Sequence, residues 1–142
     1  MSGTLLAPQH TALPYATPTR ISAPFWDGVA LGELRYQACT FCAFINVPPA
    51  DVCRECQLTG LRWEVSAGRG SLYSWTVVYR PVTPAFEVVP YAPAIVDLDE
   101  GFQLVTCLVG IAPEDITPGM AVEVEFHRVH GDLHLPYFRP AG

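Results

Sequence analysis

The sequence contains no lysine, and arginine supplies all eight of its positive charges. Fourteen acidic residues outnumber the arginines and give a formal net charge of −6 at pH 7. The arginines are scattered from Arg20 to Arg139 and form no run of basic residues. Nucleic acids and anionic lipid surfaces attract clustered basic side chains, so this composition argues against both kinds of partner.

Long apolar runs are also missing. No stretch approaches the roughly 20 apolar residues that a membrane-spanning helix needs. Residues 1–18 lack the positive segment and the continuous apolar segment of a secretory signal. We therefore expect a cytoplasmic protein that does not act at a membrane.

Familiar catalytic motifs are absent as well. The sequence has no GxSxG, no Gly-rich phosphate loop and no HExxH, and no nucleophile with an evident base. Three histidines, His127, His130 and His134, fall around one predicted hairpin and could bind a metal or act as a base. Strand alternation places His127 and His134 on the solvent-facing side, so we favour a solvent-exposed polar surface over a metal-binding or catalytic site. We expect that the chain does not catalyse alone.

Four of the five cysteines form two CxxC pairs. Cys39 and Cys42 make the first pair, ten residues follow, and Cys53 and Cys56 make the second. Two such turns facing each other supply a tetrahedron of thiolates, with no open position for a reacting water. We predict one structural metal ion, with zinc favoured over iron. Two disulfides or four free thiols are the alternatives, and Cys107 is interpreted as a buried core thiol.

The hydrophobic pattern divides the chain into three parts. Residues 1–18 are rich in proline, alanine and threonine and are expected to form a flexible arm. Residues 19–60 combine a short helix near Pro24 with the cysteine segment. Residues 61–142 contain about five strands and no convincing helix, which predicts a small closed barrel.

Several segments together resemble the DUF35 family. They are Phe25-Trp26, the two CxxC pairs, GRGSLYSWTVV at 68–78, Pro90-Tyr91, VDLDEG at 96–101, GMAV at 119–122 and PYFRP at 136–140. The resemblance covers about residues 18–141. It implies a mainly β fold in which a short N-terminal helix and a four-cysteine, rubredoxin-like zinc ribbon are followed by a five-stranded OB-fold barrel.

The resemblance also implies an accessory role. Such proteins pair with thiolase-like enzymes that perform Claisen, thiolytic or retro-aldol chemistry on acyl-CoA, in some cases on a steroid side chain. The small subunit is generally non-catalytic, docks on its partner, stabilises it and helps to form the acyl-CoA channel. We therefore expect a structural Zn²⁺ ion, a thiolase-like partner subunit and acyl-CoA at the shared interface. The scattered arginines offer no evident patch for the CoA phosphates.

Aromatic side chains are the candidate contacts with the partner or the acyl-CoA channel. The six residues are Phe25, Trp26, Tyr73, Trp75, Phe86 and Tyr91. The connection from Pro81 to Pro90 and the arm before Phe25 are further expected contact surfaces. A nucleic-acid-binding module is the alternative, because OB folds and zinc ribbons both bind oligonucleotides. A redox protein carrying iron is a third hypothesis.

Overall fold

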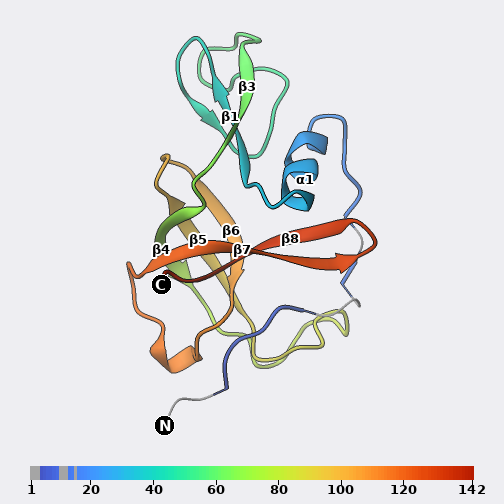
Figure 1. Ribbon diagram of the computed structural model, residues 1–142, viewed down its shortest axis with the longest axis vertical. Coiled ribbons are helices and arrows are strands. Elements are labelled where there is room, and N and C mark those ends of the chain that lie inside the picture. The colour runs from blue at the N-terminus through green and yellow to red at the C-terminus, as the bar shows by residue number, and fades with distance from the viewer. Residues whose placement is uncertain (1–3, 10–12, 15) are drawn as a thin grey trace.

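The computed structural model describes residues 4–9, 13–14 and 16–142. Its first element is the short helix expected near Pro24, which is α1, Ala23–Ala30. Pro24 lies in the first turn, where its missing N–H costs no hydrogen bond. After Leu31, Gly32 adopts a φ of +78°, the left-handed conformation that commonly ends a helix. The helix lies between the cysteine-bearing end of the molecule and the β7–β8 hairpin (Figure 1).

A three-stranded antiparallel sheet forms the end of the molecule that carries the cysteines. Its strand order is β2 (Ile45–Asn46), β1 (Arg35–Cys39) and β3 (Leu61–Val65). We call residues 35–65 the ribbon. The alternation of Glu33 to Gln37 predicts a short strand ahead of Cys39, and β1 confirms it. The division of the chain after residue 60 stays a prediction, and strand pairing places Leu61–Val65 with β1.

Five strands close into a barrel in the order β4-β5-β6-β8-β7, as expected for an OB fold. In chain order they are β4 (Arg69–Trp75), β5 (Ala92–Leu98), β6 (Gln103–Leu108), β7 (Ala121–His130) and β8 (Leu133–Pro140). A short 3₁₀ turn, η1 (Pro113–Asp115), precedes β7. Along β5 every second residue is buried, which is the alternation expected for a strand with one face in the core. The fully buried Phe138 of β8 belongs to this core.

The first barrel strand is shorter than the sequence indicated. The aromatic and β-branched run from 71 to 79 predicts one strand, but β4 ends at Trp75. The register against β5 shifts between Leu72 and Ser74. Beyond Trp75, the Thr76 N–H still donates to the Pro93 carbonyl, and an isolated bridge joins Val78 to Tyr91. The chain then enters the irregular, proline-containing connection that the sequence predicts from Pro81 to Pro90.

Gly70 occupies a position in β4 that has no room for a side chain. A Cβ atom there would lie 2.1 Å from the carbonyl oxygen of Asp97 on β5. Gly70→Ala is therefore expected to lower the free energy of unfolding by about 1–3 kcal/mol, as measured by urea denaturation. Ser71→Ala is the matched control at the next position, because serine already has a Cβ atom and the change removes only a hydroxyl group. Equal stability of the two variants would contradict the close approach.

Ring stacking by the ribbon, and hydrogen bonds from the two residues that follow it, hold the ribbon against the barrel. The run Asp99-Glu100-Gly101 predicts a hairpin turn, and the structure confirms it between β5 and β6. The Glu100 carboxylate in this turn accepts hydrogen bonds from the Ser66 hydroxyl at 2.7 Å and the Ala67 N–H at 2.8 Å. Tyr36 of β1 stacks on Phe102, with ring centroids 5.0 Å apart. These contacts orient the ribbon against the β5–β6 turn.

The described residues of the N-terminal segment lie against the barrel. The Leu6 N–H donates to the Ile111 carbonyl, and the Gly110 N–H donates to the Leu6 carbonyl, both at 2.8 Å. Gln9 exchanges two side-chain hydrogen bonds with the backbone of Val88. The predicted flexibility of the arm stays a prediction, and residues 1–3, 10–12 and 15 lie outside the described residues. Within the described residues, no helix has the length and apolar character needed to cross a membrane.

Candidate metal centre

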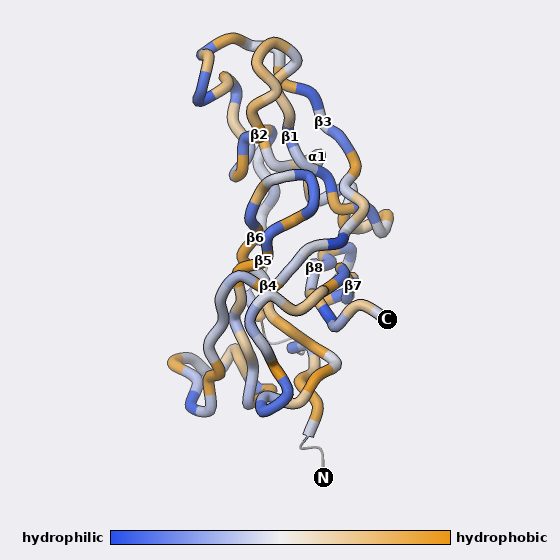
Figure 2. Tube along the Cα trace, turned by 90° about the vertical axis from the view of Figure 1, so that its left-hand side faces the viewer, coloured by the Kyte–Doolittle hydropathy of each residue, from blue (hydrophilic) through white to orange (hydrophobic). Residues whose placement is uncertain are grey.

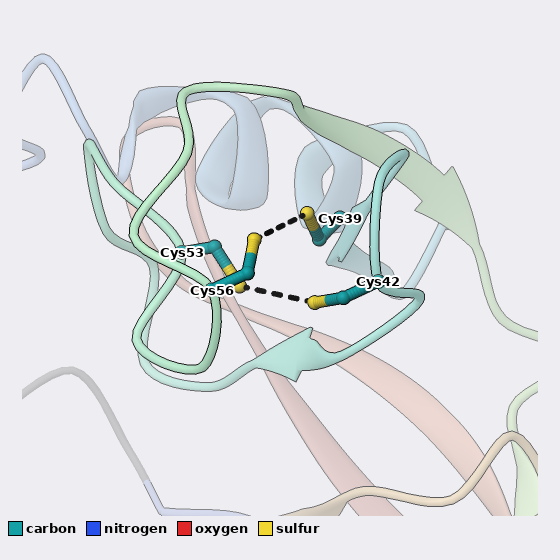
Figure 3. Close-up of side chains that lie close together, drawn as sticks. All are labelled: Cys39, Cys42, Cys53 and Cys56. Carbon is teal, nitrogen blue, oxygen red and sulfur yellow. Dashed lines mark hydrogen bonds between the residues drawn. The ribbon is translucent and has the colours of Figure 1, made fainter.

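The structure brings the four predicted cysteine ligands together at the end of the ribbon (Figure 3). All four sulfur atoms lie within 4.8 Å of one another. The Sγ atoms of Cys39 and Cys56 are 3.6 Å apart, and those of Cys42 and Cys53 are also 3.6 Å apart. None of these cysteines is in a disulfide, so the disulfide alternative does not describe this structure.

The two CxxC turns have the same backbone hydrogen bonds. In each turn, the residue after the second cysteine donates its N–H to the carbonyl of the first cysteine, at 2.9 Å. That residue is Ala43 in one turn and Gln57 in the other, with φ values of +65° and +63°. Left-handed backbone is unfavourable for residues other than glycine, so two matching instances mark a conformation imposed by the turns. The repeated geometry makes the two sulfur pairs face each other.

In each facing pair of cysteines, one thiol has a pKa below that of an ordinary cysteine and the other has a pKa above it. Burial raises the pKa of the Cys53 thiol, but hydrogen bonds from the Cys56 N–H and the Asn46 side chain outweigh it and lower this pKa to about 6. The Phe44 N–H lowers the pKa of Cys42, but burial and the neighbouring Cys53 sulfur raise it to about 12. In the other pair, the pKa of the Cys39 thiol is lowered and the pKa of the Cys56 thiol is raised. Since ligating cysteines must be deprotonated, a metal ion would displace the protons that remain.

The donor set fits a tetrahedral metal ion. Sulfurs about 2.3 Å from a central zinc ion form a tetrahedron with edges of about 3.8 Å. The two edges measured here are both 3.6 Å. Within the part of the chain that the structure describes, the group contains four thiols and no carboxylate or imidazole, which suits zinc or iron and not a hard cation. With all four positions supplied by the protein, such an ion would be structural.

The six predicted aromatic contacts do not form one site. Phe25 and Trp26 of α1 line an apolar groove of about 220 Å³ together with Pro48, Trp63 and Phe102. The groove lies between the helix, the ribbon and the barrel. Trp63 and Phe102 did not stand out in the sequence, because nothing in their local pattern places them near α1.

The other four aromatic residues are distributed over the barrel. Tyr73 is exposed, whereas Trp75 is half-buried and packs against the main core. Phe86 and Tyr91 stack with ring centroids 4.8 Å apart at the end of the Pro81–Pro90 connection. Their roles in partner or acyl-CoA contact stay predictions.

The loops of the ribbon expose a set of large apolar side chains that sequence reasoning missed. We call this set the ribbon-tip patch; its members are Phe41, Phe44, Val47, Val52 and Leu58, of which Phe44 and Val47 also lie beside the β5–β6 turn. Phe41 is 67% exposed and Leu58 is 47% exposed. Figure 2 shows hydrophobic stretches along these loops. The sequence did contain an indication of this set. Apolar residues lie next to the predicted metal ligands, in a segment too short to form a core that would bury them.

His127, on β7, lies among charged neighbours. The His127 ring nitrogen lies 2.5 Å from a Glu125 carboxylate oxygen, and its ring meets Tyr137 edge to face. Arg139 bridges Glu123 and Glu125. This partly exposed ion-pair network agrees with the interpretation of a polar surface. Cys107 is half-buried on β6, not within the core, and burial raises its pKa to about 11.

A four-cysteine ribbon joined to a five-stranded barrel defines the class as a zinc-ribbon and OB-fold protein. Two family models match it: the ChsH2 rubredoxin-like zinc ribbon domain over residues 26–60 and the ChsH2 C-terminal OB-fold domain over residues 63–127. The solved structure of an Ltp2-ChsH2(DUF35) aldolase has a TM-score of 0.82 and 36% identity, and the match covers 89% of this chain and 98% of that chain. The chain belongs to the DUF35 family.

Two curated relatives extend the comparison. A probable enoyl-CoA hydratase alpha subunit of Thermomonospora curvata is 41% identical over 120 residues, covering 82% of this chain and 37% of the relative. The chain thus spans little more than a third of that protein. A DUF35 domain-containing scaffold protein of Methanothermobacter thermautotrophicus is 32% identical over 92 residues, covering 64% of this chain and 69% of the relative.

Proposed function

We propose that this chain is a non-catalytic accessory subunit that docks on a thiolase-like acyl-CoA enzyme through its ribbon. The observation that carries the proposal is the ribbon-tip patch, five exposed large apolar side chains on the loops that also carry the four cysteines. Five large apolar side chains exposed within one short segment are unusual for a soluble protein and are accounted for by a partner that covers them. The names of the scaffold relative and of the aldolase structure support a role within a larger enzyme assembly.

The proposed metal is a structural Zn²⁺ ion held by Cys39, Cys42, Cys53 and Cys56. When bound, it would replace the core that the ribbon is too short to build. Four free thiols available to a metal require a reducing compartment, so the proposed location is the cytoplasm.

The proposed contribution to catalysis is indirect. The apolar groove beside Phe25 and Trp26 is suited to an acyl chain or an apolar side chain of the partner, and we assign it to the shared acyl-CoA channel. Retro-aldol cleavage is the favoured partner reaction, supported by the similarity to the solved aldolase and by the family resemblance. A steroid side chain is the substrate class that the resemblance offers.

Co-purification tests this proposal. The tagged chain, expressed at native levels in its host, should retain a thiolase-like subunit in a fixed ratio through size-exclusion chromatography. Native mass spectrometry would identify that subunit and its stoichiometry. The proposal would be overturned by a chain that stays monomeric when mixed with the thiolase-like proteins of the same host.

A further inference from the structure

Asn46 is the most deeply buried polar side chain in the ribbon. It ends β2, opposite Gln37 on β1, and is only 1% exposed. A buried carboxamide without partners would destabilise the fold, so its hydrogen bonds must account for its place. All of those bonds lead to the two cysteine turns.

The Asn46 side chain bridges the two turns. Its amide nitrogen lies 3.5 Å from the Cys53 sulfur and 3.4 Å from the carbonyl oxygen of Phe44. Its oxygen accepts the backbone N–H of Arg54 at 2.9 Å. The Phe44 carbonyl also accepts the Cys39 N–H at 2.9 Å. One side chain therefore connects the first turn to both a ligand atom and the backbone of the second turn.

The partners fix which way the carboxamide points. Only the amide nitrogen can donate to a sulfur and to a carbonyl oxygen, and only the amide oxygen can accept the Arg54 N–H. The donor is therefore directed at Cys53. That cysteine is buried, whereas Cys42, its 3.6 Å neighbour, is exposed.

We infer that Asn46 is a positioning residue of the metal centre, one that orients the Cys53 sulfur and holds it on the ion. The inference rests on the metal site of the proposed function. A donor aimed at a ligating sulfur spreads its negative charge and restricts its rotation, and loss of such a contact typically weakens metal binding about 10–100-fold. Cys53 then becomes the anchored ligand, and the exposed Cys42 is the sulfur most open to a competing chelator.

The test compares two isosteric changes in buried carboxamides. Asn46→Asp keeps the oxygen that accepts from Arg54 but removes the donor to Cys53. Gln37→Glu is the matched control, because Gln37 is also buried and, among the described residues, its side chain bonds the backbone of Ala50, at 2.9 and 3.2 Å, and no cysteine sulfur. Zinc transfer from each full-length variant to a chromogenic chelator gives the release rate. The cobalt-loaded forms give the thiolate-to-metal charge-transfer band.

Asn46→Asp should release zinc at least about 10-fold faster than the wild type and shift the cobalt band, while Gln37→Glu should do neither. Equal release rates and unshifted bands in both variants would overturn the inference. A measurement on the wild type avoids dependence on a variant that fails to fold. In protein loaded with ¹¹³Cd, a correlation between an Asn46 side-chain amide proton and the metal should appear through the N–H···S bond.

Absence of that correlation in metal-loaded wild type would also overturn the inference. Metal uptake by the wild type is measured first, which separates the two claims. A wild-type protein that takes up no metal overturns the metal centre and this inference together. A loaded wild type with an unaffected Asn46→Asp variant overturns only the role of Asn46 and leaves partner docking standing.

Discussion

Removal of the metal, by chelation or by Cys39→Ser, is expected to unfold the ribbon and leave the barrel folded. The main core consists mostly of barrel residues such as Leu72, Val96 and Phe138, whereas the ribbon adds only partly buried side chains such as Ile45. Binding of structural zinc supplies about 10–16 kcal/mol in comparable small domains, more than the ribbon can recover from its own packing. Amide signals of residues 35–65 should collapse in a ¹H–¹⁵N spectrum, while barrel signals persist.

Cys107→Ser is the control for this prediction. Cys107 lies on β6, outside the four-cysteine group, so its loss should leave the ribbon signals and the metal content unchanged. Dispersed ribbon signals in a metal-free Cys39→Ser variant would contradict a structural role for the metal. Loss of barrel signals in the same variant would show that the two parts fold as one unit.

Replacement of both Phe41 and Leu58 by serine is expected to weaken binding to the thiolase-like partner at least about 100-fold. Both are exposed members of the ribbon-tip patch, so their loss costs the free chain little folding energy. Buried aromatic and aliphatic anchors at interfaces contribute about 2 kcal/mol or more each, and 1.4 kcal/mol corresponds to a factor of ten. Isothermal titration calorimetry on the co-purified partner measures the effect.

Val105→Ser is the matched control for the double variant. Val105 is a large apolar residue that is exposed on β6 of the barrel and does not belong to the ribbon-tip patch. Its substitution should leave the affinity unchanged. An equal loss of affinity in the control and the double variant would contradict docking through the ribbon-tip patch.

The metal centre could be predicted from the sequence because its chemistry is local. Each CxxC pair fixes a turn whose two sulfurs converge, and Cys39 and Cys53 lie close enough in the chain for their turns to face each other. The barrel could be predicted for a similar reason. Alternation along β5 and β7, with turn residues such as Gly101 between strands, specifies strands whose apolar faces must meet.

Features that depend on contacts between distant segments could not be predicted. The groove beside α1 brings Trp26 to Trp63 and Phe102, which belong to three separate parts of the chain. The place of Leu6 beside Ile111 depends on a backbone pairing across most of the sequence. Asn46 was missed because an asparagine near cysteines is ordinary, and only its burial and the direction of its amide mark it.

Titration of the partner subunit into zinc-loaded and metal-stripped protein tests most directly whether the metal-held ribbon is the docking element. The zinc-loaded chain should bind, and the stripped chain should lose binding while circular dichroism still reports the barrel. Binding should return when zinc is restored under reducing conditions. Undiminished affinity of a verified metal-free chain would contradict docking through a metal-held ribbon.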